Sequence, residues 1–275
     1  MTTSPIPAVR QLVEHGESLA SLGWRIVDAH AHLGPTVGFY IPTPDAASMV
    51  AMMDRLGIRM TCIASHLAVS ADYARGNDQT AEAVRRFPGR FFGYVVPNPR
   101  YPEAVLPELH RGFDTLGLRA IKLHPTLQNY SVLDPACAPI WRFAEERGLV
   151  ILSHTWEGDA RCRPAHFAEL AQKHPGARFL LGHSGGTISG KREAVEVAKA
   201  HSNVYLEICG SMLACAELEW MVAEVGAERV IFGTDSPWLD PRFMLGKVAY
   251  ANLSDEQMRL ILGENVARLL ALPAD

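Results

Sequence analysis

The chain has 275 residues, of which 48% are hydrophobic, so it can bury a large core and has the right length for one large α/β barrel. Its 26 basic and 30 acidic residues give a net charge of −4. This balance argues against a broad surface for nucleic acid or an anionic membrane, because such surfaces need clustered basic residues.

The cysteines and the N-terminal residues indicate the expected compartment. Five cysteines are present and no Cys-x-x-C pair, which favours buried free thiols in a reducing environment. Met1 to Arg10 do not combine a basic segment with an apolar one, and no run of 18 apolar residues occurs. We therefore expect a cytoplasmic protein without a membrane span.

Residues 1–23 are expected to form an N-terminal extension. Apolar residues in a weak amphipathic pattern (Val9, Leu12, Val13, Leu19 and Leu22) precede Gly23 and predict a helix. The pattern leaves open whether this helix covers the bottom of the main domain or meets a second subunit of a homo-oligomer.

From residue 24 onward, short apolar runs alternate with helical patterns. The runs end 24 to 35 residues apart, the size of a strand plus a crossover helix, at His30, Ser65, Pro97, Lys122, His154, His183, Glu207 and Asp235. Helices are expected between them, bounded by capping residues, prolines and glycines, at 45–56, 103–116, 135–147, 163–174, 191–200, 215–225 and 254–270. This alternation predicts a single-domain (β/α)8 TIM barrel over residues 24–275, with an open doubly wound sheet as the alternative.

Metal-ligand residue types gather at the predicted strand ends. His30 and His32 are two apart on a strand, so their imidazoles share a face about 7 Å apart along the backbone. His154, His183 and Asp235 end three other strands. Imidazoles with one carboxylate suit zinc, or less selectively manganese, iron or cobalt, and ligands from separate strands suit an open catalytic site.

Several motifs together resemble the amidohydrolase superfamily, and most closely its amidohydrolase-2 branch, which includes aminocarboxymuconate-semialdehyde decarboxylase and related hydrolases. The resemblance spans residues 26–272 and identifies the superfamily much more firmly than the substrate. It rests on Asp28-Ala-His-Ala-His-Leu33, Ile121-Lys-Leu-His-Pro125, Gly182-His-Ser-Gly-Gly186, Gly233-Thr-Asp-Ser-Pro237 and Ile261-Leu-Gly-Glu-Asn265.

This resemblance implies a divalent metal held by His30, His32, His154 and Asp235. The ligand types make zinc the most favoured ion. Asp235 is also implied to accept a proton from metal-bound water. His183 is implied to be the catalytic acid or base in single-metal relatives, or a ligand of a second metal in binuclear ones.

The chemical state of Lys122 distinguishes the single-metal case from the binuclear one. In binuclear relatives a lysine on this strand is carboxylated and bridges two ions, whereas an unmodified Lys122 could bind a substrate carboxylate. We favour one tight metal and leave a second site, with carboxylated Lys122, as the alternative.

Six further residues near the strand ends are candidates for substrate contact: His66, Asn98, Arg100, His124, Trp156 and Glu207. For the loop residues the alternative is a hydrogen bond to their own backbone, and Trp156 could simply pack under a loop. Glu207 could instead orient a ligand imidazole, as metal-bound histidines usually require.

The expected activity is hydrolysis of a C–N or C–O bond in a small amide, lactone or ester by a metal-activated water. The alternative is metal-dependent, non-oxidative decarboxylation of an unsaturated or aromatic acid, with His183 protonating the carbon that loses CO2. A nuclease or phosphodiesterase is disfavoured, because the loops are not broadly basic.

Overall fold

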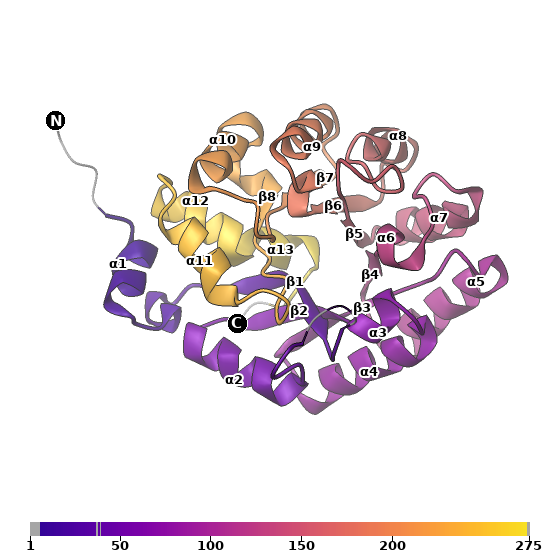
Figure 1. The fold of residues 1–275 in the computed structure, drawn as a ribbon, viewed down its shortest axis with the longest axis horizontal. Coiled ribbons are helices and arrows are strands. Elements are labelled where there is room, and N and C mark those ends of the chain that lie inside the picture. The colour runs from indigo at the N-terminus through magenta and orange to yellow at the C-terminus, as the bar shows by residue number, and fades with distance from the viewer. Residues whose placement is uncertain (1–5, 37, 39, 274–275) are drawn as a thin grey trace.

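The computed structural model describes residues 6–36, 38 and 40–273. Eight parallel strands follow one another in the order of the sequence and curve into a nearly closed barrel with helices outside it (Figure 1). The predicted barrel is confirmed. The strands are β1 (Val27–Leu33), β2 (Met60–Ser65), β3 (Phe91–Val95), β4 (Ala120–Leu123), β5 (Val150–His154), β6 (Arg178–Gly182), β7 (Val204–Glu207) and β8 (Val230–Ile231).

The barrel closes between β1 and the segment that follows the short strand β8. The backbone N–H of Ala29 donates to the carbonyl of Phe232 at 3.0 Å, that of Asp235 to His30 at 2.7 Å, and that of His32 to Ser236 at 2.7 Å. Residues 232–236 therefore run alongside β1. This pairing brings Asp235, from the far end of the chain, beside the two β1 histidines.

Thirteen α-helices, including some of a single turn, lie in the described part of the chain. They are α1 (Ala8–His15), α2 (Ala46–Leu56), α3 (His66–Val69), α4 (Tyr73–Arg86), α5 (Pro102–His110), α6 (Pro125–Gln128), α7 (Ala138–Glu146), α8 (His166–Lys173), α9 (Ile188–Ala200), α10 (Cys215–Val225), α11 (Pro241–Ala249), α12 (Asp255–Arg259) and α13 (Asn265–Leu269). Short 3-10 turns occur at Leu19–Leu22, Pro135–Cys137, His183–Gly185 and Ala227–Arg229, and π-turns at Arg111–Thr115 and Leu260–Glu264.

Helix α4 was not expected from the sequence. It buries small and polar residues, so it carries no apolar stripe that a sequence pattern would reveal. Asn77 shows why they are buried: its side chain donates to the carbonyl of Val96 at 3.0 Å and accepts from the N–H of the same residue at 2.9 Å. Helix α11 was also missed, and the π-turns interrupt two helices that were expected to be continuous.

The N-terminal helix is confirmed, and it lies against the outer wall of the barrel. Helix α1 packs against α11 and α12, and the N–H of Ala8 donates to Asp255 Oδ1 at 2.8 Å. Leu19–Leu22 lies against the end of α2, where a Cβ on Gly57 would come 2.2 Å from the backbone nitrogen of Ala20. The extension is thus part of the packed structure.

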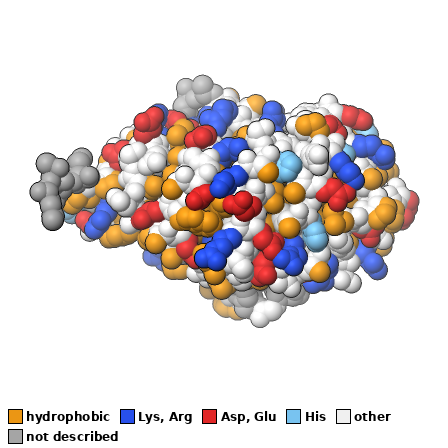
Figure 2. All heavy atoms as spheres, turned by 90° about the horizontal axis from the view of Figure 1, so that it is seen from above, with side chains coloured by type: hydrophobic (Ala, Val, Ile, Leu, Met, Phe, Trp, Pro, Cys, Tyr) orange, Lys and Arg blue, Asp and Glu red, His pale blue; other side chains and the backbone are white. Residues whose placement is uncertain are grey.

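Basic and acidic side chains are interspersed over the face shown in Figure 2, which carries no large patch of one sign. Among the described residues, none of the helices combines the length and apolar character needed to cross a membrane.

Candidate metal centre and substrate pocket

Three metal-ligand side chains converge where β1 meets the segment after β8. His30 and His32 are each 1% exposed, and their ring centroids are 5.4 Å apart. Asp235 Oδ1 lies 3.4 Å from His32 Nε2 and 3.7 Å from His30 Nε2. Asp235 has a φ of 61°, a left-handed conformation that non-glycine residues seldom adopt and that is often found at functional sites.

The N–H protons of the two imidazole rings point away from the place where the three side chains converge. His30 Nδ1 donates to Glu207 Oε2 at 2.8 Å, and His32 Nδ1 donates to the carbonyl of Ala64 at 3.2 Å. In the neutral rings both Nε2 lone pairs therefore face Asp235, whose buried Oδ1 has no hydrogen-bond partner. Converging lone pairs are the arrangement that a positive charge stabilises, and Lys122 Nζ, 2.6 Å from His30 Nε2, supplies one in this structure.

The charge states also fit a divalent metal. Burial lowers the pKa of His30 well below its usual value, which keeps its nitrogen available as a ligand. Burial alone would raise the pKa of Asp235, but His32 and the other imidazoles together hold it well below its usual range. Two imidazoles and one carboxylate form a donor set that suits zinc or manganese. The residues present therefore fit such an ion.

His154 stands beside this group in a stack of rings. Its imidazole lies 4.2 Å from that of His124, at an interplanar angle of 10°, and 6.2 Å from the Trp156 ring, at 3°. Its buried Nδ1 has no hydrogen-bond partner, but neither ring nitrogen lies within 4.8 Å of all three ligand atoms described above. Its place as a further ligand stays a prediction.

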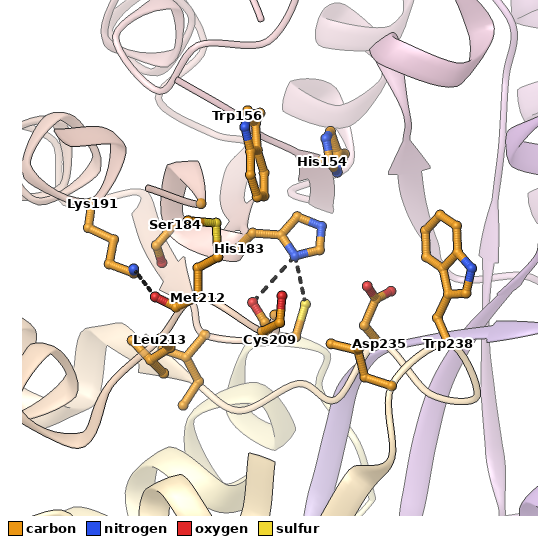
Figure 3. Close-up of a pocket in the computed structure, with 15 residues that line it drawn as sticks. His154, Trp156, His183, Ser184, Lys191, Cys209, Met212, Leu213, Asp235 and Trp238 are labelled. Atoms are coloured by element: carbon orange, nitrogen blue, oxygen red, sulfur yellow. Dashed lines mark hydrogen bonds between the residues drawn. The ribbon is translucent and has the colours of Figure 1, made fainter. Parts of the chain in front are cut away.

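His183 faces the pocket from the turn after β6. Its Nδ1 donates to the carbonyl of Cys209 at 3.3 Å, so its Nε2 is left for chemistry. Its ring lies 5.1 Å from that of His30 and 4.8 Å from that of His154. In Figure 3 the imidazole projects into the space between Trp156 and Asp235.

Glu207 and Cys209, two residues apart at the end of β7, connect these histidines. The fully buried Glu207 carboxylate accepts from His30, from the N–H of His183 at 3.1 Å and from the N–H of Cys209 at 2.6 Å. The Cys209 thiol donates to the same carboxylate at 3.1 Å and lies 3.2 Å from His183 Nδ1. Cys209 was not among the sequence candidates, although it shares the strand face of Glu207.

Lys122 reaches the same point from β4. Its side chain is 1% exposed, and Nζ lies 2.6 Å from His30 Nε2. Burial lowers its pKa to about 8. His124, two residues on, also points inward, is 4% exposed and accepts from the N–H of Leu127.

A pocket of about 270 Å³ lies directly over His183 and Asp235. The indoles of Trp156 and Trp238 stand on opposite sides of it (Figure 3), and most of the remaining wall comes from residues 208–213. Trp238 was missed in the sequence, although its position three residues after Asp235 was a usable signal.

The other sequence candidates lie outside the pocket lining. His66 stacks on His32 at 4.7 Å, and its Nδ1 donates to the carbonyl of Gly34 at 2.7 Å. Asn98 accepts from the N–H of Arg100 at 3.0 Å, the local backbone contact that was the alternative for this loop. The Arg100 side chain is exposed.

Several solved structures share this fold. A 2,6-dihydroxybenzoate decarboxylase from Rhizobium is 18% identical with a TM-score of 0.72, covering 90% of this chain and 99% of that one. A 5-carboxyvanillate decarboxylase from Novosphingobium aromaticivorans, complexed with manganese and 4-hydroxy-3-methoxy-5-nitrobenzoic acid, is 17% identical with a TM-score of 0.73, covering 94% and 99%. An uncharacterized TIM-barrel protein from Bordetella bronchiseptica is 19% identical with a TM-score of 0.74, covering 90% and 98%. At these identities the likeness shows the fold alone.

The sequence itself matches the family model described as amidohydrolase over residues 27–272, from the first residue of β1 to beyond α13. That span includes all eight strands and every residue of the candidate metal centre. The chain belongs to the amidohydrolase-2 family.

Proposed function

We propose that this protein is a metal-dependent decarboxylase that removes CO2 from a small aromatic or unsaturated carboxylic acid. The observation that carries the proposal is the pocket over His183 and Asp235, which has an indole on either side and is suited to a flat ring. The 5-carboxyvanillate and 2,6-dihydroxybenzoate decarboxylases with this fold, one of them complexed with manganese and a substituted benzoic acid, support it.

His30, His32 and Asp235 would hold the metal, with His154 beside them. A bound divalent ion supplies positive charge that attracts the acidic oxygens of the substrate and stabilises the charge that develops as CO2 leaves. The donor set suits manganese as well as zinc, so our expectation of zinc stays a prediction.

His183 would manage the proton. Decarboxylation breaks a C–C bond and leaves an electron pair on the carbon, which must then receive a proton. The Cys209 carbonyl fixes the Nδ1 proton of His183, so Nε2 can take a proton from the acidic group of the incoming substrate and deliver it to that carbon. Trp156 and Trp238 would hold the ring beside this nitrogen.

Hydrolysis of an amide, lactone or ester would use the same residues. It has weaker support than decarboxylation, because both of the solved structures described above that have a named reaction are decarboxylases. It is therefore the competing outcome of the test.

The test uses the full chain loaded with Mn²⁺ or Zn²⁺ and two substrate panels, one of hydroxybenzoic acids and one of esters, lactones and amides. We expect metal-dependent CO2 release from an acid, with one deuterium on the product carbon when the reaction runs in D2O. His183→Asn should lower kcat by about 100-fold or more while metal content is retained. The matched control is His15→Asn, at an exposed position on α1. Metal-dependent hydrolysis without CO2 release would overturn the proposal.

A further inference from the structure

The loop between β7 and α10 forms one continuous wall of the pocket. Gly210, Ser211, Met212 and Leu213 all line it, directly after Cys209, whose carbonyl holds His183. The wall thus begins at the residue that fixes the proposed proton carrier and ends in two apolar side chains. The position of this loop determines the shape of the space that a substrate enters.

Two buried lysines hold the loop by its backbone carbonyls. Lys191 on α9 is 2% exposed, and its Nζ donates to the carbonyl of Met212 at 2.7 Å (Figure 3) and lies 3.0 Å from Glu217 Oε2 on α10. This single ammonium group therefore ties the far end of the loop to two helices.

Lys247 holds the near end of the loop from α11. Its Nζ donates to the carbonyl of Gly210 at 2.9 Å and to that of Ser211 at 3.4 Å, and lies 4.1 Å from the centre of the Phe243 ring. Within the described part of the chain, no carboxylate lies within salt-bridge distance of it. Burial lowers its pKa to about 8, which agrees with a charge compensated mainly by carbonyl dipoles and an aromatic face.

A buried ammonium group is costly unless its protons are satisfied. Three successive carbonyls of the loop provide acceptors for the two lysines, so displacement of the loop would leave two buried charges without these partners. The energetic cost favours one loop conformation. The lysines lie on helices outside the strand ends, and neither belongs to the candidate metal centre.

We infer that Lys191 and Lys247 are positioning residues that fix the substrate wall from opposite ends. Lys191 sets the distance of Met212 and Leu213 from the substrate. Lys247 holds the residue next to Cys209 and so also keeps the Cys209 carbonyl on His183. The two lysines should therefore have different kinetic effects, a consequence that rests on the proposed function.

The first test needs no substrate. Hydrogen exchange is measured on the loop peptide 208–214 in wild-type protein, Lys191→Met and Lys247→Met, with Lys199→Met, at an exposed position on α9, as the matched control. Loss of a charged hydrogen bond should speed loop exchange by about 10-fold or more in the two buried-lysine variants and leave the control and the β1 peptide unchanged. Unchanged loop exchange in both variants would overturn the inference.

The second test is kinetic. Lys191→Met should raise KM by about 10-fold with kcat within about threefold, whereas Lys247→Met should also lower kcat by about 10-fold. Identical kinetic effects of the two variants would contradict the division of roles.

If a methionine variant does not fold, the corresponding Lys→Arg variant replaces it, because a guanidinium group cannot place a single ammonium between the carbonyls. The same hydrogen-exchange criterion then applies to the arginine variant. If no decarboxylation is found, the exchange result still decides whether the lysines anchor the loop.

Discussion

Glu207→Gln isolates the hydrogen-bond partner of the proposed ligand His30. In the wild-type protein the carboxylate accepts from four donors: His30 Nδ1, the N–H of His183, and both the N–H and the thiol of Cys209. Glutamine has the same shape but one acceptor oxygen and an NH2 group, which can only donate. The NH2 group of the glutamine therefore faces at least one hydrogen-bond donor, with which it cannot pair.

The consequence for His30 follows from its two nitrogens. With the oxygen of the introduced amide near the N–H of Cys209, the amide NH2 faces His30 Nδ1, and His30 must move its proton to Nε2 to avoid two donors in contact. Nε2 is the nitrogen that faces Asp235 and would bind the metal. Loss of such a partner typically weakens metal binding 10- to 100-fold, about 1.4 to 2.7 kcal/mol. Unsatisfied buried donors should also lower the free energy of unfolding by about 2 to 4 kcal/mol.

The assay is the dissociation constant for Zn²⁺ or Mn²⁺, measured by competition with a chelator. Glu224→Gln, at an exposed position on α10 that pairs with Lys199, is the matched control and should bind metal like the wild type. If Glu207→Gln also bound metal within twofold of the wild type, the proposed orientation of His30 and the assignment of its Nε2 to the metal would both be refuted.

Three further changes test packing and charge. Gly186→Ala should displace the Trp156 ring, because a Cβ on Gly186 would lie 2.4 Å from a ring carbon and the backbone there has a φ of 74°. We expect a shifted tryptophan emission spectrum and a higher KM. An unchanged spectrum would contradict this packing of Trp156 on Gly186. Gly263→Ala should lower the free energy of unfolding by about 3 kcal/mol or more in denaturant titrations, because the Cβ would lie 1.7 Å from a carbonyl before β1. The hydrogen bonds from Arg161 lower the pKa of the Asp159 carboxylate, so Asp159→Asn should cost about 1 kcal/mol at pH 7. The stabilisation is complete above the unfolded pKa of about 4 and is lost as pH falls from there towards the lower folded pKa. The difference between variant and wild type should therefore shrink below about pH 4, and a constant difference would argue against the ion pair.

The succession of strands could be predicted from the sequence because the strands of this barrel are short, largely buried and mainly apolar. The ends of β2, β5 and β7 were placed at Ser65, His154 and Glu207, as observed. The end of β8 was harder to predict, because only Val230–Ile231 form a regular strand and the residues that follow pair with β1 in an irregular way. Helix α4 could not be predicted from apolar periodicity, because its buried face consists of small and polar residues.

At the site, period-two spacing was enough to place His30 and His32 on one face, and their positions at predicted strand ends pointed to His154, His183 and Asp235. The sequence offered no way to rank the loop candidates. Arg100 is exposed whereas Trp238 borders the pocket, and the difference arises from how their loops pack.

The sequence by itself determined the barrel, the family and the residue types of the candidate metal centre, since these depend on local patterns that repeat along the chain. Tertiary structure alone decided that Glu207 orients His30, that Cys209 holds His183, and that Lys191 and Lys247 reach the loop after β7 from two different helices. These contacts join residues far apart in the chain, and their energies depend on burial and on where each proton points. Such properties exist only once the barrel has closed.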